Sequence, residues 1–300
     1  MKKLTKAEQD RIDNFCDAVF ASGQVDCKTT VTRPDPFEPF IYPFQNLGQD
    51  RYVKFEADGR VPFYGYWQPS FRKQAPLLIH TPAYGSEMSM HPELTDSFNV
   101  LHVNPLGLCT LDGWDKSKMT FGGMSPVLPD TISTDGKGGY FDWLSCVAMA
   151  VKWAWGQDNV IPDRVGFFGT SQGGGAALLM GSIFSGRGTV CVAADQPFLT
   201  NFEKAAGRGA YGSLIGKHDK TQAEINDALF NYDTMYHLHR FNFPILLSAG
   251  GKDDTCPPDT IESLFVQLNN SKSYTLFKHL PHGYSREALN LAKAWFLIYG

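Results

Sequence analysis

This sequence predicts an α/β fold in which a mostly parallel sheet carries helices on both faces. Short apolar runs typical of buried strands alternate along the chain with longer segments of helical periodicity. One apolar run, residues 165–168, ends in a glycine-rich turn that leads directly into a helical segment. With 300 residues, 43% of them hydrophobic, the chain can enclose a large core. We therefore expect one domain over residues 1–300.

The N-terminal part is expected to add an antiparallel extension to this sheet. Apolar residues recur at helical spacing over residues 4–20. Residues 32–47 are rich in proline and aromatic side chains, which excludes a helix, so residues 1–50 should form a helix and an extended strap. Two β-rich runs, 51–57 and 61–67, flank Asp58-Gly59 and predict a hairpin.

The centre of the chain combines buried strands with one long irregular segment. Strands are predicted at 76–81 and 98–103 because these are short, mostly apolar runs typical of buried strands. Residues 104–139 are dense in Gly, Pro, Ser and Asp, and long loops of this kind are often functional, so we expect this segment to border the functional site. A helix is predicted over 140–155.

The remaining elements continue the alternation of strands and helices to the end of the chain. Residues 198–243 are irregular apart from a helical piece near 221–230, and we expect them to form a small lid. The other predicted elements are strands at 189–194, 244–248 and 274–277, and helices at 257–268 and 285–299.

The turn after residue 168 reads Gly169-Thr170-Ser171-Gln172-Gly173, which matches G-x-S-x-G. In a nucleophile elbow, the serine sits on a strained strand-to-helix turn, with its hydroxyl exposed at the positive end of the helix. Gly169 and Gly173 then allow close backbone packing on either side. Ser171 is the candidate nucleophile; the alternative is an ordinary glycine-rich turn in a chain with 29 glycines.

A serine hydroxyl needs a base, and the base needs a carboxylate that fixes its tautomer. Loops after two later predicted strands carry Asp253 and Asp254, and then His279 and His282, in the chain order that an α/β-hydrolase requires. We assign His282 as the base and Asp253 as its acid. His279 is interpreted as a packed or surface residue, Asp254 as solvent-facing or capping the helix at 257, and Asp195 receives no direct role.

Hydrolysis through an acyl-enzyme also needs N–H donors for the oxyanion. The N–H of Gln172, directly after the serine, should be one of them. The other should come from the loop after the strand at 77–81, where Pro82 has no N–H and Ala83, Tyr84 and Gly85 remain.

Longer motifs accompany the serine turn in the second half of the chain. They are Y-F-D-W at 140–143, D-R-V at 163–165, G-T-S-Q-G-G-G at 169–175, D-Q-P-F-L at 195–199, and an aspartate ahead of C-P-P at 256–258. With these motifs the chain resembles a divergent member of the acetyl xylan esterase and cephalosporin C deacetylase family, a group of carbohydrate esterases with the α/β-hydrolase fold. The resemblance runs from about residue 140 to the end.

The resemblance implies a serine esterase that removes acetyl groups from sugar or similar alcohols without a metal or other cofactor. The family's triad positions fall on Ser171, Asp253 and His282, and its oxyanion donors fall on Gln172 and Tyr84. The implied partner is a small-molecule ester, and the family often forms homo-oligomers. An oligopeptidase-type serine peptidase and a catalytically silent binding protein are the alternatives.

Two substrate-facing elements depart from the family pattern. Residues 104–107, Asn-Pro-Leu-Gly, stand where the family usually has R-G-Q, and His282-Gly283 stands where it usually has H-E. The fold and the triad do not depend on either element. Acyl and alcohol preference are the properties that these changes affect.

Composition excludes several other classes. The net charge of −4 and the absence of a basic run argue against nucleic acid as a partner. No apolar segment resembles a signal peptide or a membrane span, so we expect a soluble, cytoplasmic protein. The six cysteines are widely spaced and form no C-x-x-C pair, which predicts reduced, mostly buried thiols rather than a zinc site or disulfides.

Overall fold

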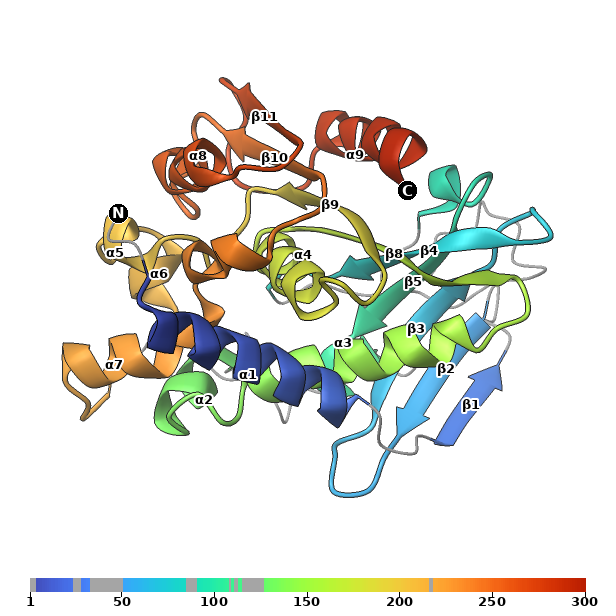
Figure 1. The fold of residues 1–300 in the computed structure, drawn as a ribbon, viewed down its shortest axis with the longest axis horizontal. Coiled ribbons are helices and arrows are strands. Elements are labelled where there is room, and N and C mark those ends of the chain that lie inside the picture. The colour runs from blue at the N-terminus through green and yellow to red at the C-terminus, as the bar shows by residue number, and fades with distance from the viewer. Residues whose placement is uncertain are drawn as a thin grey trace.

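A nine-stranded sheet forms the centre of the molecule, in the order β1-β2-β3-β5-β4-β8-β9-β10-β11 (Figure 1). The computed structural model describes residues 4–23, 28–32, 51–84, 91–107, 109–110, 113–114, 127–215 and 218–300. The strands of this sheet are β1 (Lys28–Thr32), β2 (Arg51–Glu56), β3 (Phe63–Gln68), β4 (Ala75–Thr81), β5 (Asn99–Asn104), β8 (Val160–Thr170), β9 (Thr189–Asp195), β10 (Ile245–Gly250) and β11 (Lys272–Phe277). A separate short pair is formed by β6 (Cys109–Thr110) and β7 (Gly113–Trp114).

The predicted mixture of parallel and antiparallel pairing is confirmed. Strands β5, β4, β8, β9, β10 and β11 pair in parallel. The pairs β1-β2, β2-β3 and β3-β5 are antiparallel, and β2-β3 is the predicted hairpin. Apart from Thr32 at the end of β1, the predicted strap at 32–47 lies outside the described residues.

Helices cover both faces of the sheet, as the sequence predicts. They are α1 (Lys6–Ser22), α2 (Val127–Ser133), α3 (Tyr140–Trp155), α4 (Gln172–Ile183), α5 (Phe202–Ala205), α6 (Ala210–Ser213), α7 (Gln222–Leu229), α8 (Pro258–Gln267) and α9 (Arg286–Tyr299). Four short 3-10 helices lie among the described residues; those used below are η2 (Pro105–Gly107) and η5 (Thr234–Arg240).

Two apolar cores explain why the central strands are mostly hydrophobic. In β8, Phe167 belongs to the larger core, which includes residues of α1, α3, α4 and α8, whereas Phe168 belongs to a smaller core with Phe296 of α9. Successive side chains of a strand point to opposite faces, so a strand buried on both faces carries apolar residues on both of them. Because β8, β9 and β10 pair in parallel, their carboxyl ends lie at one edge of the sheet, between two helical layers.

The long segment at 104–139 contains more regular structure than its composition suggests. Residues Val127–Ser133 form α2, which packs against α3 and buries Val127, Leu128 and Ile132. Pro129 lies in the first turn of α2, where a missing N–H costs no helical hydrogen bond. The expectation of a loop was therefore wrong for this stretch, because tertiary packing of its apolar stripe outweighs the local Gly and Pro content.

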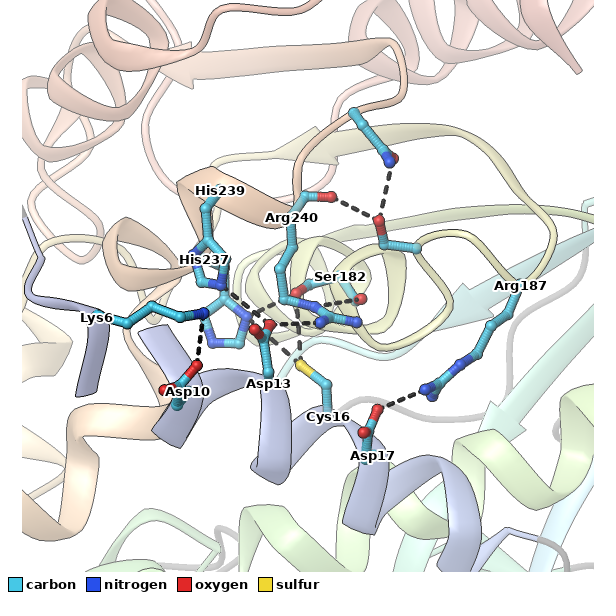
Figure 2. A network of polar contacts seen from close by, with 12 residues as sticks. Lys6, Asp10, Asp13, Cys16, Asp17, Ser182, Arg187, His237, His239 and Arg240 are labelled. Carbon is cyan, nitrogen blue, oxygen red and sulfur yellow. Dashed lines mark hydrogen bonds and ion pairs between the residues drawn. The ribbon is translucent and has the colours of Figure 1, made fainter. Parts of the chain in front are cut away.

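The N-terminal helix packs on the core through one apolar stripe and is held by polar contacts at its edges (Figure 2). Asp13 accepts hydrogen bonds from Arg240 at 2.6 Å and His239 at 3.1 Å, both in η5. Asp17 of α1 forms an ion pair with Arg187, which follows α4. These contacts join the first helix to segments far away in the sequence.

Within the described ranges, no helix combines the length and the hydropathy needed to cross a membrane. No group of three or more His, Cys, Asp or Glu side chains in those ranges is placed to bind a metal ion. The cysteines with described side chains are buried free thiols, as expected: Cys16, Cys146, Cys191 and Cys256.

Candidate active site

Ser171 lies at the turn between β8 and α4 in a strained backbone conformation. Its φ is 61° and its ψ is −121°, a region that costs about 1–3 kcal/mol for a residue with a side chain. Three backbone hydrogen bonds hold the turn: the N–H of Ser171 donates to Asp195 O at 2.9 Å, and its carbonyl accepts from Gly175 at 3.0 Å and Phe198 at 2.8 Å. The strain is thus stabilised by the neighbouring end of β9 and the loop after it.

Glycine is required on both sides of the serine, as the elbow motif predicts. A Cβ at Gly169 would lie 2.5 Å from the carbonyl oxygen of Thr81, and a Cβ at Gly173 would lie 2.1 Å from the same oxygen. Both distances are far inside van der Waals contact. The first turn of α4 can therefore approach β4 only with glycine at these positions.

The structure brings Ser171, His282 and Asp253 together from three separate loops. His282 Nε2 lies 2.8 Å from Ser171 Oγ, and His282 Nδ1 lies 2.8 Å from Asp253 Oδ2. The aspartate side chain is fully buried, while the imidazole keeps 21% of its surface exposed. A carboxylate only accepts hydrogen bonds, so Nδ1 carries the proton and Nε2 is free to accept the serine proton.

The two adjacent aspartates have different surroundings. The second oxygen of Asp253, Oδ1, accepts the N–H groups of Thr255 at 2.9 Å and Cys256 at 2.8 Å, which fixes the carboxylate. Asp254 is exposed. Neither residue caps α8, whose N-cap is Pro257 without a side-chain hydrogen bond, so the capping alternative is wrong. Asp253 faces the histidine because its carboxylate closes the turn at 253–256.

Both residues predicted to supply the oxyanion donors, Gln172 and Tyr84, line the cavity at Ser171. The N–H of Gln172 is in the first turn of α4, where N–H groups have no partner within the helix. The Gln172 side chain accepts a hydrogen bond from Tyr140 Oη at 2.8 Å, which holds this residue in place. Tyr84 lines the same cavity as Ser171. Of its two rivals, Ala83 donates its N–H to Tyr284 Oη at 3.4 Å, and Gly85 lies outside the described residues.

A cavity of about 350 Å³ lies next to these groups. Its walls include Phe198, Ala210 and Leu214 from the segment at 198–243, for which we expected a lid. None of the described residues of 104–139 lines this cavity, and the rest of that segment lies outside the described residues. Of the two departures from the family pattern, Gly283 lines it, whereas η2 packs against α3 and β3.

The chain matches one known protein family over the part that carries this site. The family model for acetyl xylan esterase matches residues 140–299, which is more than half of the chain. The chain belongs to the acetyl xylan esterase family. It is therefore a member of a family of ester hydrolases, and the motifs at 140–143, 169–175 and 195–199 all lie within the matched range.

Solved structures show that this esterase has the α/β-hydrolase fold. Acetyl xylan esterase 1 from Thermoanaerobacterium sp. superposes with a TM-score of 0.75 at 17% identity, over 99% of both chains. Acetyl xylan esterase from Paenibacillus sp. R4 gives 0.70 at 16% identity, over 100% of this chain and 96% of the other. Acylaminoacyl peptidase from Pyrococcus horikoshii gives 0.60 at 14% identity, but only 40% of that longer chain is covered.

A residue next to the histidine loop has a role that the sequence did not predict. Gln196 is fully buried and follows directly after β9. Its Nε2 donates to Pro281 O at 3.2 Å, and its Oε1 accepts from the N–H of Gly283 at 2.8 Å. The two amide ends thus hold the backbone on either side of His282. A polar residue at the carboxyl end of a buried strand was the available signal.

We expect Gln196→Leu to lower kcat of this esterase by about tenfold to a hundredfold, with a smaller change in KM. The reason is that the imidazole loses both backbone anchors, and a shift of about 1 Å in a catalytic group has an effect of this size. Steady-state kinetics with an acetyl ester measure it. Gln222→Leu, on the exposed side of α7, is the matched control. Equal kinetics for the two variants would contradict the role of Gln196.

Proposed function

We propose that this protein is a serine carboxylic ester hydrolase that works through an acyl-enzyme on Ser171. The observation that carries the proposal is the continuous hydrogen-bonded series from Ser171 Oγ through His282 to Asp253, with both distances at 2.8 Å. This series ends at a serine held at the N-terminus of α4. The proposed chemistry requires no metal or other cofactor.

In the proposed mechanism, His282 Nε2 takes the proton of Ser171 as its oxygen attacks the ester carbonyl. The imidazolium that forms is stabilised by Asp253. The N–H groups of Gln172 and Tyr84 hold the oxyanion, and the positive end of α4 favours the same negative charge. His282 then donates its proton to the leaving alcohol, and a water molecule, activated by the same imidazole, releases the acid.

The proposed substrate is a small acyl ester, most simply the acetyl ester of a carbohydrate or similar alcohol. Family membership supports this choice, as do the names of the two esterases with similar folds. The Ser171 cavity has room for a group of this size and has apolar side chains, including Phe198 and Leu214, in its wall. We also propose assembly into a homo-oligomer, by analogy with the resemblance described above.

A substrate panel tests the proposed function. Acetyl, butyryl and feruloyl esters, acetylated sugars and matched peptide amides are compared by kcat/KM. We expect acetyl esters to be the best substrates and amides to be far poorer. Faster turnover of amides would favour a peptidase instead, and no turnover together with no labelling by a fluorophosphonate would indicate a catalytically silent protein.

A further inference from the structure

A second cavity lies on the other side of the strand ends, between the sheet and the start of α9. Its volume is about 190 Å³, smaller than most drug-sized ligand sites and suited to a ligand of few atoms. The sheet side includes Phe168, Ala193 and Leu246, and the helix side includes Ala288 and Ala292. Alanines on both sides leave the space open where larger residues would close it. The cavity is thus a consequence of side-chain size.

Asp195 is the acidic residue in the wall of this cavity. Its Oδ1 accepts a hydrogen bond from Ser248 Oγ at 2.6 Å, and its Oδ2 accepts one from Thr170 Oγ1 at 3.1 Å. Both partners are neutral hydroxyl groups. Among the described residues, no lysine or arginine forms an ion pair with this carboxylate. The charge of Asp195 is therefore without a balancing cation in direct contact.

Other charged or titratable groups lie near this carboxylate, including His282 of the catalytic loop, but none of those described forms an ion pair with it. His80 is buried, and burial lowers its pKa well below the usual value, so the ring stays neutral. His91, also buried, pairs with Glu93 at 3.3 Å. Arg286 lies at the exposed start of α9. Burial raises the pKa of Asp195 to about 6, which leaves it largely ionised at mildly alkaline pH.

We propose that this cavity binds a small organic amine, with the ammonium group on the carboxylate of Asp195 and the apolar part against Phe168, Leu246 and Leu289. An ionised carboxylate with little water around it gains most from a cationic hydrogen-bond donor. The apolar walls supply affinity for an alkyl or aryl group. A neutral alcohol of the same shape lacks the charge, and an anion is repelled.

The site is connected to the catalytic turn. Thr170 and Tyr284 line both this cavity and the one at Ser171. In addition, the backbone carbonyl of Asp195 accepts the N–H of Ser171 at 2.9 Å. The amine has two sources that fit this position: a separate ligand, or the amino group of an ester substrate bound at the serine. The chemistry at Asp195 is the same for both.

Benzylamine and benzyl alcohol test the proposal directly, by calorimetry at mildly alkaline pH. We expect benzylamine to bind at least about tenfold more tightly than the alcohol. Asp195→Asn, which keeps the shape and removes the charge, should abolish this preference, whereas the exposed Asp254→Asn should keep it. Equal binding of both compounds, or an amine preference that survives Asp195→Asn, would overturn the proposal. Thermal melts establish that each variant is folded.

Two further arms separate the outcomes. Ala288→Leu fills the cavity and should weaken benzylamine binding without removing the charge of Asp195; unchanged binding would place the amine elsewhere and overturn the proposal. Repeating the titration on Ser171→Ala makes the result independent of catalysis and of the proposed function. Competition with hydrolysis of an amino-ester, and none with a neutral ester, identifies the substrate's amine; binding without competition identifies a separate ligand.

Discussion

Replacing Ser171 by alanine is expected to lower kcat/KM for an acetyl ester by about four orders of magnitude or more. The variant keeps the fold because alanine fits the space of serine, but no acyl-enzyme can form without the hydroxyl group. Hydrolysis of p-nitrophenyl acetate, followed by absorbance, measures the loss. Activity that remains reflects only attack by water at the oxyanion site.

Ser213→Ala is the control for this experiment. Ser213 lines the same cavity but makes no described hydrogen bond to His282, so its loss should change kcat/KM only a few-fold. If Ser171→Ala and Ser213→Ala had similar activities, the nucleophile would not be Ser171.

Asp253→Asn is expected to reduce kcat by about a thousandfold to ten-thousandfold. An amide in this buried position can present a donor to His282 Nδ1, which favours the tautomer whose Nε2 already carries a proton. That imidazole cannot accept the proton of Ser171. Steady-state kinetics with an acetyl ester measure the effect, and KM should change much less than kcat.

The neighbouring aspartate supplies a closely matched control for Asp253→Asn. Asp254→Asn makes the same chemical change one residue away, but on an exposed side chain, and should leave kcat within about twofold. A large loss in Asp254→Asn with normal activity in Asp253→Asn would show that the carboxylate partner of His282 is Asp254 in solution.

Much of the fold could be predicted because its signals are local. Apolar runs of strand length and one helical stripe placed the central elements, and the helix expected at 140–155 coincides with α3 (Tyr140–Trp155). The serine turn is also a local signal, since its G-x-S-x-G pattern lies within five consecutive residues, 169–173. Ser171, Asp253 and His282 occur in the chain order that this fold requires, and a parallel sheet brings the loops that carry them to one edge.

Other features depend on contacts that no local pattern contains. The helix α2 forms where its apolar side chains meet α3, although its flanks are rich in Gly and Pro. The choice of Asp253 over Asp254 depends on the direction of each side chain in one turn. The role of Gln196 depends on the approach of the loop at 281–283 to the end of β9. The cavity beside Asp195 depends on alanines from separate elements lying opposite one another.

The central claim is that an acyl group is carried by Ser171 during turnover, and mass spectrometry of the quenched reaction tests it most directly. The enzyme is mixed with an excess of an acetyl ester, stopped with acid within the first turnovers and digested to peptides. We predict one acetyl group on the peptide that contains Ser171, and none on this peptide from Ser171→Ala. An acetyl group that accumulates on another residue, with Ser171 unmodified, would contradict the account.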